Sequence, residues 1–317
     1  MRKTLRPLRV QAAGYCCSSP ALAHPYPQAN VHMWPDDGLY LISVGGGGGA
    51  AQLMPSTLLR SCVEAAHDAV FASDSNLENN ALLPTNSHSV PSEQLTNLFE
   101  NLNHRMGALV SSEPPGSGRW GDYVGSGAYV VACAVELGTE EEEENQTFWF
   151  DSVGLGRAYA VEPGAWVQLT MDDSLDPLPT SGVDVQSSHE PRRRSSAYSR
   201  IVTSSLNGQW LSDRQSRGRA PIAYRANDVL GFLLATETIH QAVPPPLLAE
   251  ETRFALENSN LDEGARILWT HLRERLATDE SRQTLRADYD RTAALLLLKP
   301  RLPYPARRSP SPASQAR

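Results

Sequence analysis

Lysine is almost absent from this chain, which carries it only at Lys3 and Lys299. The phosphate loops of ATPases and the active sites of kinases need a lysine beside the nucleotide phosphates. Five glycines at 45–49 could cradle an oxyanion through their amides, but Ala-Ala-Gln follows at 50–52. The missing lysine therefore excludes both enzyme classes. A dinucleotide-binding fingerprint is also weak evidence, because a run of glycines matches G-x-G-x-x-G trivially.

Common catalytic motifs, cysteine pairs and long apolar runs are missing too. The four cysteines form no C-x-x-C pair and no disulfide framework, and the apolar neighbours of Cys62 and Cys133 are typical of buried thiols. The chain has no H-E-x-x-H zinc motif and no G-x-S-x-G nucleophile elbow. No stretch approaches the roughly 18 apolar residues that a membrane-spanning helix needs. We therefore expect no membrane span.

Acidic residues are absent from both ends of the chain. None precedes Asp36 and none follows Asp290, although the whole protein has a net charge of -8. The acid-free, arginine-bearing segment 1–35 is typical of a mitochondrial presequence, which implies the matrix; an ordinary disordered basic end is the alternative. The tail 300–317 is basic and rich in Pro and Ser, which predicts a disordered or extended segment. The acidic body argues against a generally basic nucleic-acid surface.

Hydrophobic spacing predicts one domain, at 36–299, with helices packed on sheets. The expected helices are 54–71, 93–109, 244–257 and 261–277. The expected strands are 39–44, 128–137, 147–153, 157–161, 166–170, 228–235 and 292–298. The core side of the second helix is expected to consist of Leu95, Leu98, Phe99, Leu102 and Met106. This order of elements indicates an α+β fold.

A long polar flap at 172–222 interrupts the domain. Loops of this length in a compact domain are usually functional or disordered. The flap contains Arg192, Arg193 and Arg194, and the tail contains Arg307 and Arg308. These guanidinium groups could contact RNA phosphates or acidic proteins, and solvated disorder is the open alternative.

Several short strings, in this order of elements, resemble the metal-dependent (PPM, type 2C) protein phosphatases, especially their short mitochondrial branch. ISVGGGG at 42–48 stands where the family has V-A-D-G-x-G-G, and the helix after it is similar. SVGLGRAY at 152–159 resembles the V-G-D-S-R-A-Y hairpin, and QLTMDDS at 168–174 resembles Q-L-T-x-D-H-S. GSGA at 125–128, ATETI at 235–239 and YDRT at 289–292 match the remaining motifs. The resemblance covers about 39–298 and implies a β-sandwich in α-β-β-α layers.

The resemblance also implies a centre of two Mg²⁺ or Mn²⁺ ions, hard cations that bind carboxylate oxygens and activate water. In this chain Val44, followed by Gly45, takes the place of one carboxylate. Glu237 stands in place of a second, one methylene longer, and Tyr289 in place of a third. Asp290 or Asp288 could replace Tyr289 only with a shifted backbone. Glu237 and Asp290 alone could hold at most one ion, weakly, so we predict that the pair of ions is lost.

Two further changes point the same way. No acid is available from the N-terminal strand in any register, and the hairpin aspartate has become Leu155. Val44 also removes carboxylate repulsion, so we expect Mn²⁺ to leave the melting temperature unchanged.

We predict a pseudophosphatase with no cofactor and no catalytic residue, which acts as a binding or scaffold subunit. The most plausible setting is a mitochondrial assembly such as the ribosome or its assembly intermediates. The main alternative is a divergent but active Mn/Mg-dependent serine/threonine phosphatase. A regulator that shields a phosphorylated partner without hydrolysis is the third reading.

Overall fold

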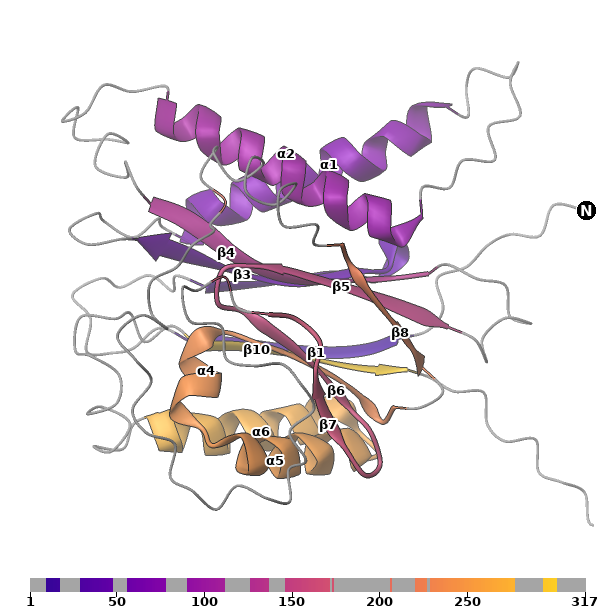
Figure 1. The fold of residues 1–317 in the computed structure, drawn as a ribbon, viewed down its shortest axis with the longest axis vertical. Coiled ribbons are helices and arrows are strands. Elements are labelled where there is room, and N and C mark those ends of the chain that lie inside the picture. The colour runs from indigo at the N-terminus through magenta and orange to yellow at the C-terminus, as the bar shows by residue number, and fades with distance from the viewer. Residues whose placement is uncertain are drawn as a thin grey trace, which may run out of the picture.

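The computed structural model describes residues 10–17, 29–47, 56–77, 90–111, 126–136, 146–171, 173, 206, 220–226, 229–276 and 293–300. Two stacked antiparallel sheets form the centre of the molecule, with one layer of helices outside each sheet (Figure 1). The expected α+β sandwich in α-β-β-α layers is confirmed. Within the described residues, no helix is both long and apolar enough to cross a membrane.

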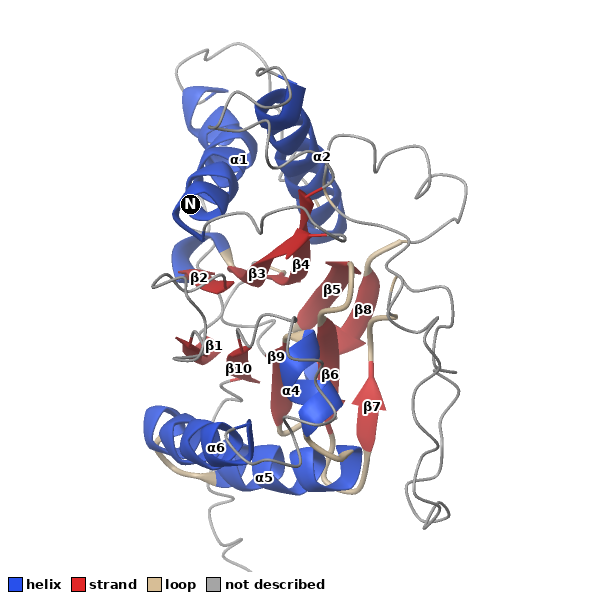
Figure 2. Ribbon diagram, turned by 90° about the vertical axis from the view of Figure 1, so that its left-hand side faces the viewer, coloured by secondary structure: helices blue, strands red, loops and turns tan. Residues whose placement is uncertain are grey.

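The first sheet has the strand order β2-β3-β4-β5-β8, and every neighbouring pair is antiparallel. Its strands are β2 (Ala29–Trp34), β3 (Leu39–Gly47), β4 (Ser126–Val135), β5 (Thr147–Val153) and β8 (Ile222–Arg225). A single-turn helix, η1 (Pro35–Asp37), joins β2 to β3. Helices α1 (Ser56–Leu77) and α2 (Pro91–Ser111) cover the outer face of this sheet (Figure 2).

The second sheet has the order β1-β10-β9-β6-β7. Its strands are β1 (Val10–Cys17), β10 (Ala293–Pro300), β9 (Gly231–Ala235), β6 (Arg157–Val161) and β7 (Trp166–Gln168). Three helices lie on its outer side: α4 (Glu237–Ala242), α5 (Pro245–Glu257) and α6 (Leu261–Leu276).

The apolar runs of the sequence are explained by burial on both faces of the central strands. In β4, Val130 and Ala132 face α1 and α2, whereas Val131 and Cys133 face the opposite sheet. A strand buried on both sides needs no polar alternation.

Cys62 and Cys133 are buried free thiols, as predicted. The predicted core residues of α2 are all buried: Leu95, Leu98, Phe99, Leu102 and Met106.

Three phenylalanine rings fill the space between the sheets. Phe232 of β9 lies 4.6 Å from Phe148 and 4.8 Å from Phe150, both of β5, between ring centroids. Tilted rings at this separation bring the positive edge of one ring toward the negative face of the next. The contact fixes β5 of the first sheet against β9 of the second.

The folded domain begins before residue 36, contrary to the expected boundary. β1 pairs with β10 from Val10 opposite Pro300 to Cys17 opposite Ala293, and β2 pairs with β3. β10 is a continuous apolar run and needs a hydrogen-bonded neighbour on each side; among the described strands, β1 and β9 supply them. Sequence spacing misses β1 because its small and polar residues, with Gly14 among them, give no hydrophobic alternation.

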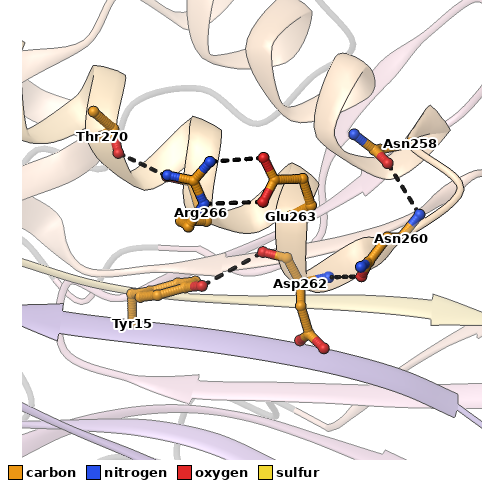
Figure 3. Close-up of polar contacts among 7 residues, drawn as sticks. All are labelled: Tyr15, Asn258, Asn260, Asp262, Glu263, Arg266 and Thr270. Atoms are coloured by element: carbon orange, nitrogen blue, oxygen red, sulfur yellow. Dashed lines mark hydrogen bonds and ion pairs between the residues drawn. The ribbon is translucent and has the colours of Figure 1, made fainter.

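Tyr15 joins β1 to α6, and Figure 3 shows its polar contact together with the polar contacts at the start of α6. The Tyr15 hydroxyl donates to the backbone oxygen of Asp262 at 3.4 Å, and the Tyr15 ring stacks on Trp269 with centroids 6.0 Å apart. The carboxamide oxygens of Asn258 and Asn260 accept from backbone amides and shape the turn before α6. An exposed ion pair on α6 joins Glu263 to both Nε and Nη2 of Arg266, and the Thr270 hydroxyl donates to the Arg266 backbone oxygen.

Two further elements were not expected from the sequence. β8 occupies 222–225, so the strand begins at the last residue of the expected flap, and Leu206 inside that flap bridges Ala128 of β4. Helix α4 follows β9 without a loop, because Thr236 is already its N-cap. Both elements are too short to give a hydrophobic period.

Candidate functional site

The Val44 end of β3 lies at the edge of the apolar core between the sheets. Val44 is half-buried and packs against this core, and it pairs with Ala29 of β2 and Tyr129 of β4. Gly45 is buried and stands opposite Ala128. The position at which the resemblance implies a carboxylate therefore belongs to the hydrophobic packing of the sandwich.

The strands next to β3 and β10 carry no acid at this end. Neither β1 nor β2 contains Asp or Glu. Near Val44, β2 instead places the buried amide Asn30, whose Nδ2 donates to the Ser56 backbone oxygen at 3.0 Å. This bond ties the start of α1 to the sheet. The sequence reading missed Asn30, although the alternation of polar and apolar residues through 30–33 is a strand signal.

Glu237 is the first residue of α4 and is half-buried. Its carboxylate accepts a hydrogen bond from Nε2 of Gln241, one turn further along the helix. The preceding Thr236 is tied to β10, because its N–H donates to the Ala294 oxygen and its hydroxyl accepts from the Ala294 N–H, each at 3.1 Å. These bonds place Glu237 beside the first residues of β10.

The turn between β5 and β6 lies at the same end of the sandwich. Gly154 has φ of 92°, in the left-handed region, and a Cβ there would lie 2.3 Å from the Tyr129 ring. A Cβ on Gly156 would meet Val131 at 3.2 Å and the Ala235 oxygen at 3.8 Å. Only glycine fits Gly154, and the turn packs closely on β4 and on the end of β9.

Two groups hold this turn. Gly154 N–H donates to Oδ2 of Asp173 at 2.9 Å, and the Asp173 N–H donates back to the Gly154 oxygen at 2.9 Å. On the other side, Nε2 of His240 lies 2.8 Å from the Leu155 oxygen. A carbonyl only accepts, so His240 carries its proton on Nε2. Leu155 itself is buried, with 2 % of its surface exposed.

The described residues at this end do not offer enough carboxylates for two hard cations. Mg²⁺ and Mn²⁺ favour oxygen ligands, and a binuclear pair needs several carboxylates. Val44 and Leu155 present apolar side chains, and the Glu237 carboxylate already accepts from Gln241. Among the described residues, no cluster of three or more His, Cys, Asp or Glu side chains is present.

The remaining predicted site residues lie outside the described part of the chain. They are Tyr289, Asp290, Arg192, Arg193, Arg194, Arg307 and Arg308. Their roles stay predictions. The structure does place Val44, Gly45 and Glu237 near strand or helix ends, and it adds Asn30, Asp173 and His240, which sequence reasoning did not select.

The fold matches solved serine/threonine phosphatases along most of its length. Stp1 from Staphylococcus aureus has a TM-score of 0.61 at 14% identity, with 94% of this chain and 98% of that chain covered. PstP/Ppp from Mycobacterium tuberculosis has a TM-score of 0.57 at 16% identity, covering 92% and 98%. Another structure, of the PstP catalytic domain, is a complex with two manganese ions (TM-score 0.54, 16% identity, covering 92% and 99%).

This likeness shows the PPM-type phosphatase fold. Identities of this size do not extend to activity or ligands. No protein-family model matches the chain, and no curated protein matches it. Similarity to the PPM-type phosphatases, expected from short motifs, is therefore confirmed at the level of the fold.

Proposed function

We propose that this protein is a catalytically inactive PPM-type phosphatase-like subunit that acts by binding. The observation that carries the proposal is the apolar packing of Val44, where the resemblance implies a metal-binding carboxylate, together with that of Leu155, where it implies the hairpin aspartate. Two cations close together repel each other and are held only by the negative charge of their ligands. With no carboxylate at Val44 or Leu155, the described residues would supply too little negative charge to hold two such ions and the water that they would activate.

The runner-up is a divergent, active metal-dependent serine/threonine phosphatase. One observation favours it: Glu237 keeps a carboxylate at the start of α4, half-exposed and directly after β9. Asp290 would have to supply a second carboxylate from just before β10.

Phosphate release separates the two readings. We expect the full chain to release no phosphate from a phosphoserine or phosphothreonine peptide in the presence of Mn²⁺ or Mg²⁺, because the ions lack ligands. The measurement is inorganic phosphate over time, with a solved bacterial phosphatase of this fold as the positive control. Metal-dependent release that Glu237→Ala abolishes would establish the enzyme and contradict the proposal.

Protein partners in a larger complex are the proposed ligands. The body of the protein is acidic while the chain ends and the 192–194 loop are basic, so contacts of both signs are available. We propose a mitochondrial matrix assembly, such as the ribosome or its assembly intermediates, with RNA phosphates reached through the basic segments. The acid-free N-terminus supports the location, and the size of such assemblies supports a scaffold role.

The position of β1 limits where a presequence can end. Val10–Cys17 is hydrogen-bonded along β10, so cleavage near residue 35 would remove both β1 and β2 from the sheets. We propose that any cleavage on import occurs before Val10, where Arg2, Lys3, Arg6 and Arg9 are found.

A further inference from the structure

The β5–β6 turn is bonded to the rest of the molecule from both sides, by Asp173 and by His240. We propose that Gly154, Leu155, Asp173 and His240 form a turn clamp that closes this end of the sandwich without a metal ion. The inference rests on the proposed function, in which this end of the sandwich holds no metal ions. It goes further by naming the protein groups that hold the turn.

The Asp173 half of the clamp is a closed pair of hydrogen bonds. The carboxylate of Asp173 accepts from the Gly154 amide, and the Asp173 amide donates to the Gly154 oxygen, both at 2.9 Å. Asp173 is 3 % exposed, so its bond to the amide is screened little by water. This pair holds the chain just after β7 against the turn.

The His240 half joins the turn to α4. His240 Nε2 donates to the Leu155 oxygen at 2.8 Å, and Leu155 is separated from His240 by 85 positions in the sequence. Helix α4 is itself fixed to β10 through the two bonds between Thr236 and Ala294. Hydrogen bonds therefore connect the turn, α4 and the start of β10.

Leu155 makes the closure apolar. Its side chain is 2 % exposed, between two glycines that let the turn pack on Tyr129 and Val131. A carboxylate in its place would lose its hydration and would need a cation or a charged partner to offset the cost. A leucine needs neither. Its side chain packs inside the turn, and its backbone oxygen accepts the hydrogen bond from His240 of α4.

The clamp is tested with the full chain, comparing His240→Ala with His271→Ala, which removes an exposed histidine of α6. Losing this partly buried hydrogen bond is expected to speed amide exchange in peptides spanning 153–157 about five- to tenfold and to lower Tm by roughly 2–5 °C. His271→Ala should leave both unchanged. MnCl₂ and EDTA should not alter the Tm of the unchanged protein.

Two results would overturn the clamp. The first is exchange at 153–157 in His240→Ala that equals that of the unchanged protein. The second is a Mn²⁺-dependent rise in Tm, because a metal would then close the end of the sandwich. If His240→Ala does not fold, Asp173→Asn replaces it and should raise exchange at the Gly154 amide; unchanged exchange there counts against the clamp. Phosphate release bears on the proposed function alone.

Discussion

At the residue scale, a row of stacked rings joins α1 to β2. We call its members, His32, Trp34, His67 and Phe71, the α1–β2 seam. Trp34 stacks between His32 and His67, with ring centroids 5.3 Å and 4.2 Å away, and His67 stacks on Phe71 at 4.7 Å. Nε2 of His67 also lies 2.9 Å from the Asp37 carboxylate. The seam fastens α1 to β2 and η1, and its aromatic contacts explain why His67 is buried rather than a surface residue.

His32 gives this seam a defined pH dependence. Burial, and then the nearby Arg60 and His67, lower the pKa of His32 from 6.5 to about 4. Nε2 of the ring shares a hydrogen bond with the Ser43 hydroxyl at 3.2 Å. Between pH 6.5 and pH 4 the unfolded chain binds a proton that folded His32 does not, so stability is full above pH 6.5 and falls toward pH 4.

We therefore expect His32→Gln to flatten the pH dependence of the free energy of unfolding by up to about 3 kcal/mol between pH 7 and pH 4. The glutamine stays neutral and can still reach Ser43. Urea unfolding at a series of pH values measures the effect. His271→Gln, on the exposed side of α6, serves as the control and should keep the original slope. An unchanged slope in His32→Gln would contradict the shifted pKa.

At the element scale, the two N-terminal strands are decisive for the architecture. β1 completes one sheet and β2 completes the other, and the Val31 side chain occupies the space beside Gly14 that a Cβ there would need. The two strands thus close one side of the sandwich.

Lys299, one of two lysines, joins β10 to the end of α5, because its ammonium donates to the Leu256 and Asn258 backbone oxygens. A cation at a helix C-terminus is stabilising.

Deletion of residues 1–17 tests the role of β1. We expect a loss of unfolding free energy on the order of 5 kcal/mol, because the deletion exposes β10 along its length and removes the contact of Tyr15 with Trp269. Circular dichroism during urea unfolding measures the loss. Deletion of 1–9, which stops short of β1, should leave the midpoint unchanged. Equal midpoints for the two deletions would show that β1 is dispensable.

At the scale of the whole molecule, the chain combines a phosphatase fold with an acidic body and basic ends. The apolar core between the sheets runs up to Val44, so hydrophobic packing extends to the position where the resemblance implies a carboxylate. A fold that keeps its layers but loses its ligands can still present surfaces to partners. The basic segments and the acidic body are then the natural contacts to test.

Affinity purification from mitochondria addresses the whole protein. We expect the tagged full chain to co-sediment with a large particle, and Arg192→Glu/Arg193→Glu/Arg194→Glu to weaken that association as charge attraction becomes repulsion. The matched control reverses Arg307 and Arg308 instead, which separates the loop from the tail. A pool that stays monomeric, or outside mitochondria, would contradict the proposed setting.

The sequence by itself determined the fold class, most strands and helices, the core face of α2 and the apolar residues at Val44 and Leu155. These features follow from local periodicity and from residue types at recognisable motifs. It did not reveal β8 and α4, which are short, or β1 and β2, whose small and polar residues become strands through the neighbours that pair with them.

Only the tertiary structure decided how the end of the sandwich is held together. Asp173 and His240 are far from the β5–β6 turn in sequence, and no pattern in the chain predicts that one bonds Gly154 and the other Leu155. Such long-range hydrogen bonds depend on how two sheets and a helix are stacked, which is set by burial of the apolar core as a whole.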